Sequence, residues 1–206
     1  LNFNHNDLRT QYAFKSAEPI DGKDNDRNGL IDDRYGWDFH DNDRYPWDDV
    51  GHGTHVAATA GADANGSGIL GSNPEARLVI IKNGGKDGVY TSNSIRSVNY
   101  AITTGARVIN MSWGGPTYSN ALYSALKAAQ QRDIVMVASA GNSSQNIDSQ
   151  PSYPASYNLK NIVTVASTNP ADSHSTFTNY GKKSVDVMAP GTSIYSADYR
   201  GNSSYS

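Results

Sequence analysis

The hydrophobic positions divide the chain into a polar stretch and a longer region of alternating strand and helix patterns. Residues 1–51 are rich in Asp and Asn, which predicts loops. From residue 52 onward, short apolar runs alternate with segments whose apolar residues recur every three to four positions. The first kind predicts buried strands and the second predicts amphipathic helices. The predicted strands are 77–82, 106–112, 134–141, 161–167 and 184–190, and the predicted helices are 52–62, 92–105 and 119–133.

This alternation predicts an α/β fold, because a strand, a helix and a second strand in succession form a parallel pair with a crossover helix. We expect one domain over residues 1–206, with a three-layer architecture in which helices cover both faces of a mainly parallel sheet. Ser92 is expected to cap helix 92–105, and Gly105 to end it. Ligands of such sheets bind beyond the carboxyl ends of the strands. The loops at 83–90, 112–115 and 139–144 are therefore candidate site segments.

Composition narrows the function classes. With 20 acids against 17 bases, the net charge of −3 predicts no attraction for nucleic acid. The longest apolar stretch, 134–138, is far too short to cross a membrane, and the first residues lack the basic start and apolar centre of a signal peptide. Cysteine is absent, which excludes disulfides and thiolate metal sites. A cysteine-free chain is compatible with secretion from a bacterium that relies on metal ions for stability.

Eleven of the 20 acids lie between Glu18 and Asp49, which predicts a cation-binding region over residues 18–49. Its first loop, 24–33, follows the start of an EF-hand pattern, with oxygen ligands at alternate positions and Gly29 at position 6. Position 12 is Tyr35 instead of the bidentate Glu, so Asp32 or Asp33 is expected to supply that carboxylate. An oxygen-only ligand set favours calcium. The predicted ligands are Asp24, Asp26, Asn28, the Leu30 carbonyl, and Asp32 or Asp33.

Seven short motifs follow one another along the chain. Three are GHGTHVA (51–57), NMSWGG (110–115) and ASAGN (138–142). The others are NHNDL (4–8), SYPA (152–155), FTNYG (177–181) and APGTSIYS (189–196). In this order and at this spacing they resemble the subtilisin-like serine proteases, the subtilase family. The resemblance implies a secreted, monomeric serine endopeptidase with an Asp-His-Ser triad, peptide or protein substrates and, in the parent protein, an N-terminal propeptide.

The resemblance also assigns roles to individual residues. His52 is expected to be the general base, and Asn142 to donate to the oxyanion. His55, nearly one turn after His52, is expected to be structural and to pack against the sheet. Trp113 has an alternative interpretation as a core aromatic. The expected substrate-binding residues are Gly88, Val89, Tyr90, Ser112, Trp113, Gly114, Ser139, Ala140 and Gly141.

The resemblance further implies two more calcium sites. One combines Asp38, Asp41 and Asp43, just before His52. The other lies in the loop 62–69 and is expected to use Asp7, Asp63, Asn65, Ser67 and Ile69, partly through main-chain carbonyls. Calcium is thus the expected cofactor.

Two motifs of the family are not found in these 206 residues. The family's triad acid lies in a D-[ST]-G segment and its nucleophile in a G-T-S-M-A segment. Gly191-Thr192-Ser193 follows Ala189-Pro190 and matches an earlier family segment. We therefore expect the domain to be incomplete at both ends and the isolated chain to be inactive. The alternatives are a non-catalytic subtilase-like domain that binds peptides or a partner, and an extracellular calcium-binding module based on residues 18–49 alone.

Overall fold

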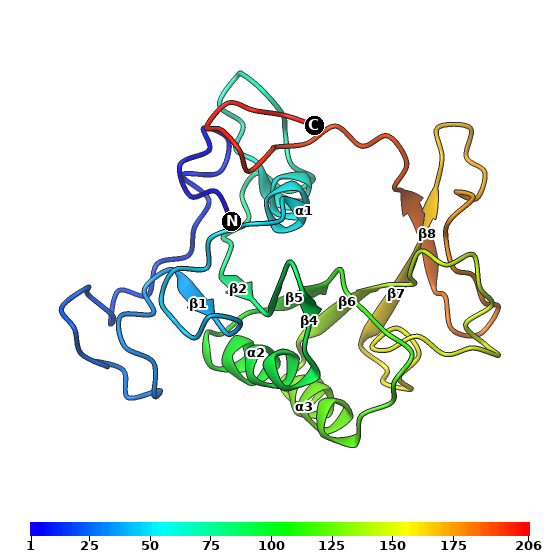
Figure 1. The fold of residues 1–206 in the computed structure, drawn as a ribbon, viewed down its shortest axis with the longest axis horizontal. Coiled ribbons are helices and arrows are strands. Elements are labelled where there is room, and N and C mark those ends of the chain that lie inside the picture. The colour runs from blue at the N-terminus through cyan, green and yellow to red at the C-terminus, as the bar shows by residue number, and fades with distance from the viewer. The chain divides into compact units, whose positions relative to one another are not determined.

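The computed structural model describes all 206 residues, which form two compact units. One unit comprises Leu1–Ser97 and Tyr195–Ser206, and the other comprises Val98–Ile194. Figure 1 shows the helices and strands of both units. None of the helices has the length and apolar character that crossing a bilayer requires. The single domain over residues 1–206 stays a prediction.

The first unit is built around α1 (His52–Gly61) and two small sheets. Strands β1 (Gly36–Asp38) and β2 (Ile80–Lys82) pair in parallel, and β3 (Gly84–Gly85) and β4 (Gly88–Val89) form an antiparallel hairpin. Gly36 has φ +122°, and a Cβ there would lie 1.8 Å from the Ile80 carbonyl oxygen, so only glycine fits at the start of β1. The core of this unit contains Leu1, Leu8, Tyr12, Ala58, Ala62 and Ala197.

The second unit contains a four-stranded parallel sheet in the order β5-β6-β7-β8. Its strands are β5 (Val108–Met111), β6 (Val135–Ser139), β7 (Ile162–Thr168) and β8 (Val187–Pro190). Helix α3 (Asn120–Gln130) connects β5 to β6 and buries Leu122, Ala125, Leu126 and Ala129. The Ser119 hydroxyl caps this helix by accepting from the Leu122 amide at 3.2 Å. The parallel sheet and connecting helices confirm the predicted α/β class.

Helix α2 (Thr91–Thr103) spans the boundary between the two units and corrects one prediction. The helix begins at Thr91, so Ser92 lies inside its first turn and does not precede it as a cap. The predicted end is confirmed, since Gly105 follows the helix with φ +76°, a backbone conformation that glycine adopts without strain.

The predicted burial of two strand regions is wrong. Residues 77–82 were expected to form a buried strand, but β2 has only three residues and each is half-buried. The strands of the larger sheet were expected to be covered on both faces. Because side chains alternate between faces, one face carries the buried Met111, Met136 and Ala138. The other carries Val108, Val135 and Val187, which are 57%, 42% and 49% exposed. Apolar composition shows that a face can be covered, but not whether other residues cover it.

Candidate active site

The first turn of α1 carries His52, and an aspartate holds the loop in front of it. Oδ1 of Asp48 accepts hydrogen bonds from the amides of Val50 and Gly51, at 2.9 and 2.7 Å. Oδ2 accepts from the amide and the hydroxyl of Thr54, both at 2.7 Å. Amides in a first helical turn have no partner within the helix. Asp48 supplies that partner, although the sequence analysis did not single it out, because its position before the helix matches no common cap spacing.

Asp48 is expected to stabilise the loop and helix that present His52. Asp48→Ala should lower the free energy of unfolding by about 1–2 kcal/mol at neutral pH, because the Thr54 amide loses its acceptor. The control is Asp49→Ala, whose side chain is 44% exposed and lies 3.6 Å from Lys82. That exposed pair should contribute less than about 1 kcal/mol. Urea denaturation of both variants measures the difference, and equal stability of Asp48→Ala and the unmodified chain would contradict the assignment.

The same contribution should depend on pH. Burial disfavours the charged form of Asp48, but hydrogen bonds from Gly51 and Thr54 outweigh burial and lower the pKa of this carboxyl below its ordinary 3.8. A lowered folded-state pKa gives stability that is complete above the unfolded-state pKa and disappears as the pH falls through the folded-state value. The stability difference between the unmodified chain and Asp48→Ala should therefore shrink below about pH 4.

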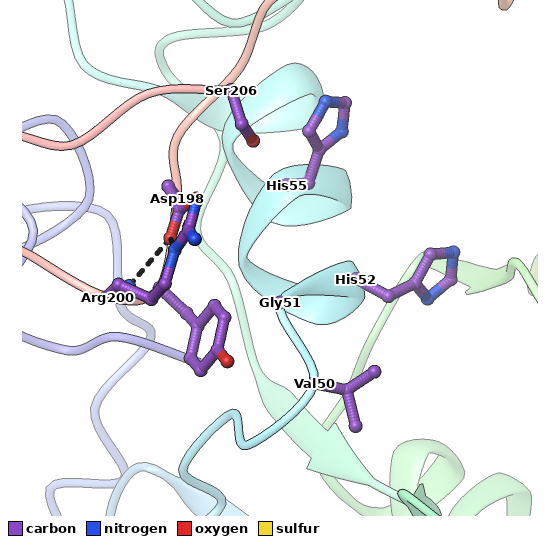
Figure 2. A pocket seen from close by; sticks show the side chains of 8 residues that line it. Val50, Gly51, His52, His55, Asp198, Arg200 and Ser206 are labelled. Carbon is purple, nitrogen blue, oxygen red and sulfur yellow. Dashed lines mark hydrogen bonds and ion pairs between the residues drawn. The ribbon is translucent and has the colours of Figure 1, made fainter.

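A pocket of about 530 Å³ lies beside α1 and includes His52. Figure 2 shows the His52 imidazole projecting from the N-terminal end of α1, on the side away from Asp198 and Arg200. The Arg200 guanidinium donates to both oxygens of Asp198 and lowers the pKa of that carboxyl to about 2. The pocket is lined by Val50, Gly51, His52, His55, Asp198, Tyr199, Arg200 and Ser206. Ser206, in the segment GNSSYS (201–206), thus lines the same pocket as the predicted base.

His55 is half-buried and lines the same pocket as His52. Its predicted packing against the sheet stays a prediction. Residues three apart on a helix lie on neighbouring parts of one face. Both histidines therefore reach the pocket.

The first predicted substrate segment, Gly88, Val89 and Tyr90, forms the outer strand of the β3–β4 hairpin and the residue after it. Val89 and Tyr90 are 45% and 49% exposed. His40, which was not predicted to belong to the site, packs against this hairpin. A Cβ on Gly85 would lie only 2.8 Å from Nε2 of His40. The His40 ring also stacks on Tyr90, with 6.2 Å between ring centroids. An exposed strand edge that packs against His40 is suited to pairing with an extended peptide.

The other two predicted substrate segments lie at the carboxyl ends of neighbouring strands. Ser112, Trp113 and Gly114 follow β5, and Ser139, Ala140 and Gly141 end or follow β6. Met111 and Ala138 are partners in the parallel register, so the two segments leave the sheet side by side. Trp113 is half-buried, which does not support a fully buried core role. Asn142 follows directly and is exposed.

Ser152 lies between these two segments and was not predicted. A Cβ on Gly114 would lie 3.4 Å from the Ser152 hydroxyl, and a Cβ on Gly141 would lie 3.7 Å from it. Both glycines therefore lie next to this hydroxyl. Ser152 is distant in sequence from both segments, and its place follows only from the bridge between Gly115 and Tyr153.

The structure brings together three acids of the first predicted calcium loop. Oxygens of Glu18, Asp26 and Asp33 all lie within 4.8 Å of one another. Glu18 was counted in the acidic region but not predicted as a ligand. It is fully buried, and its Oε2 has no hydrogen-bond partner. Lys15 lies against Asp26 and Asp33, with its Nζ at 2.5 and 2.7 Å.

The remaining predicted ligands of this loop make hydrogen bonds or an ion pair, and calcium binding by them stays a prediction. Asp24 accepts from the amides of Asn28 and Gly29, at 3.0 and 2.8 Å, and so shapes the turn. Asp32 accepts from two amides at residues 21 and 22 and pairs with Arg44. The Leu30 amide donates to Asn28 Oδ1 at 2.8 Å. Of the two aspartates left open by the sequence, Asp33 therefore joins the cluster and Asp32 does not.

In the second predicted site a lysine lies between the acids. The Lys82 ammonium is 3.0 Å from both Asp38 and Asp41. Burial opposes its charge, but these carboxylates outweigh burial and raise the pKa of Lys82. Asp43 instead accepts from the Tyr45 amide at 2.7 Å. Calcium binding at Asp38, Asp41 and Asp43 stays a prediction.

The third predicted site is centred on the fully buried Asp7. Its carboxylate accepts from the Asn65 amide group at 2.9 Å and from the Ile69 main-chain amide at 3.1 Å. The Asp63 amide donates to the Asp7 carbonyl at 2.8 Å. Ser67 donates to Asn65 Oδ1 from both its amide and its hydroxyl, at 2.9 Å. The structure thus brings all five predicted residues together.

Comparison with known proteins agrees with these motifs. The whole chain, residues 1–206, matches the model of the subtilase family. It is 41% identical over 163 residues to thermitase from Thermoactinomyces vulgaris, which covers 78% of this chain and 56% of that protein. It is 38% identical over 164 residues to subtilisin DY from Bacillus licheniformis, covering 78% and 58%. The chain therefore spans little more than half the length of these relatives.

A solved structure gives the same result for the fold. The crystal structure of a cold adapted subtilisin-like serine proteinase matches with a TM-score of 0.78 and 31% sequence identity. That match covers 100% of this chain and 64% of the solved one. A family match over every residue, together with this structural likeness, shows that the chain belongs to the subtilase family.

Proposed function

We propose that these 206 residues are the central part of a secreted, calcium-stabilised serine endopeptidase. The domain they belong to is a single subtilisin-like catalytic domain, in which His52 is the general base and Asn142 donates to the oxyanion. The observation that carries this proposal is the pocket shared by His52 and Ser206. The predicted base and the segment 201–206 therefore line one pocket, as expected if a family segment with the nucleophile follows Ser206.

The substrate is a peptide or protein bound in extended form. In the unit Val98–Ile194, Ser112–Gly114 and Ser139–Gly141 are the proposed walls of the pocket for the residue before the cleaved bond. In the other unit, the exposed edge at Tyr90 and its neighbours is a candidate for pairing with an extended peptide. The side chains of the pocket walls are neutral and, apart from Trp113, small, which favours an apolar residue. The Ser152 hydroxyl lies next to Gly114 and Gly141 of these walls. A propeptide in the parent protein and a monomeric state follow from the family resemblance.

Calcium is the proposed cofactor, and the cluster of Glu18, Asp26 and Asp33 fits it. Three carboxylates carry more negative charge than the one ammonium of Lys15 neutralises, and the buried Glu18 Oε2 has no other partner. Oxygen ligands of this kind select a hard divalent cation. The ion would supply stability to the loop and no chemistry to peptide hydrolysis.

The isolated chain is expected to show no peptide hydrolysis, because it contains neither the D-[ST]-G nor the G-T-S-M-A segment. A chromogenic peptide with an apolar residue before the scissile bond is the measurement. Turnover by the purified chain that His52→Ala abolishes would contradict this expectation. If a form that also carries both segments binds peptides but never cleaves them, the chain belongs to a non-catalytic peptide-binding domain, and the proposed enzymatic function is wrong.

A further inference from the structure

A buried asparagine from a distant part of the chain contacts the loop that carries Asn142. Asn179 is only 3% exposed. Its Nδ2 donates to the Ala140 carbonyl at 2.9 Å. Its Oδ1 accepts from the amides of Ser143 and Gln145, at 2.9 and 3.0 Å. One side chain therefore holds the main chain on both sides of Asn142.

The main chain of Asn179 adds a fourth contact and a steric limit. Its amide donates to the Gly141 carbonyl at 2.8 Å. Gly141 has φ +105°, and a Cβ there would lie 2.4 Å from Nδ2 of Asn179. The loop and the asparagine thus fit so closely that only glycine is accommodated at position 141.

Asn179 is itself held by the sheet. The neighbouring Thr178 hydroxyl accepts from the Ser167 amide on β7 at 2.9 Å. Strand β7 in turn pairs with β6, the strand from which the Asn142 loop departs. The irregular Asn142 loop is therefore hydrogen-bonded to a residue whose own position is fixed by the regular sheet.

We propose that Asn179 is a positioning residue that fixes residues 140–145 so that the exposed Asn142 amide points outward into the site. This inference rests on the proposed function, in which Asn142 donates to the oxyanion. A donor stabilises developing charge most when it is held in place before the reaction. The position requires a side-chain amide, because Nδ2 donates one hydrogen bond while Oδ1 accepts two. Aspartate keeps the acceptors but lacks the donor, and alanine keeps neither.

Hydrogen exchange of the isotope-labelled chain tests the contact directly. Asn179→Ala should raise the exchange rates of the Ser143 and Gln145 amides about tenfold, since each loses a buried acceptor. Asn179→Asp should keep both amides within about threefold of the unmodified chain, because it retains the acceptor oxygens. Unchanged rates in Asn179→Ala overturn the inference.

A matched control uses another asparagine of the same unit. Asn169 Oδ1 also accepts from two backbone amides, those of Ala171 and Ser173, at 2.9 and 3.2 Å. Asn169→Ala should raise the exchange of those two amides and leave Ser143 and Gln145 unchanged. If Asn169→Ala loosens the Asn142 loop as much as Asn179→Ala does, the effect is a general loss of stability and the inference is overturned.

Peptide binding separates positioning from simple stabilisation. The probe is acetyl-Ala-Ala-Pro-Leu with a free C-terminal carboxylate, which presents an anion where the oxyanion would develop. In the unmodified chain the side-chain amide signals of Asn142 should shift on binding. Asn142→Ala and Asn179→Ala should each weaken binding about tenfold, and in Asn179→Ala the Asn142 signals should no longer shift. Asn179→Asp should recover part of the shift.

The variants distinguish failure of this inference from failure of the proposed function. If Asn142→Ala weakens binding but Asn179→Ala does not, the positioning role is wrong and the donor role stands. If Asn142→Ala binds the peptide as the unmodified chain does, the donor role in the proposed function is wrong, and the positioning role falls with it.

Discussion

His52→Ala should abolish peptide hydrolysis in a longer form of this chain that also carries the two family segments with the triad acid and the nucleophile. This longer form carries a D-[ST]-G segment before residues 1–206 and a G-T-S-M-A segment after them. Losing the base leaves the nucleophile hydroxyl protonated and removes the group that returns its proton to the leaving amine. The expected loss in kcat is about 10⁶-fold, a value measured on subtilisin itself.

Two further variants show whether the decrease in kcat of His52→Ala is specific to catalysis. Asn142→Ala should lower kcat about 10²–10³-fold with little change in KM, because the donor acts on charge that develops in the transition state. His174→Ala is the matched control, since this histidine is exposed and lies in the unit that does not contain His52. It should leave kcat unchanged. A loss below about tenfold for His52→Ala, in protein shown to be folded, would falsify its role as the base.

The elements of this fold were predictable where hydrophobic periodicity is strong. Helix 119–133 and strands 134–141 and 161–167 appear as α3, β6 and β7 with small changes at their ends. Strand 77–82 was predicted less well. Its apolar run begins before the three residues that pair with β1, and a run alone does not show where pairing begins.

Candidate site residues can be proposed from the sequence where a motif is continuous, and not where residues distant in sequence contact the motif. His52 and Asn142 lie inside their motifs. Asn179 contacts the Asn142 loop only through tertiary structure, although FTNYG (177–181) marked its neighbourhood. Likewise Glu18 precedes the loop 24–33 that it joins, and EF-hand spacing gives no position to a ligand outside the loop.

Calcium should raise the stability of this chain, and Glu18 should account for much of the effect. An ion that binds only the folded state adds about 2.7 kcal/mol at a hundredfold excess over its dissociation constant. For a chain of this size that corresponds to a rise in Tm of about 5–10 °C. Calorimetry in calcium and in a chelator measures the rise. An equal Tm in both solutions contradicts calcium binding at every proposed site.

Glu18→Gln separates the cluster of Glu18, Asp26 and Asp33 from the two other proposed sites. In calcium this variant should be less stable than the unmodified chain, because it loses a charged ligand. In the chelator it should be equally stable or more stable, because it removes a buried carboxylate whose Oε2 has no partner. Glu75→Gln, at the chain's other and exposed glutamate, should match the unmodified chain in both solutions. The sign of the Glu18→Gln effect on stability therefore depends on calcium only if the ion binds at this cluster. A loss of stability that is equal in both solutions would instead mean that Glu18 stabilises the loop through Lys15 and the loop backbone, without an ion.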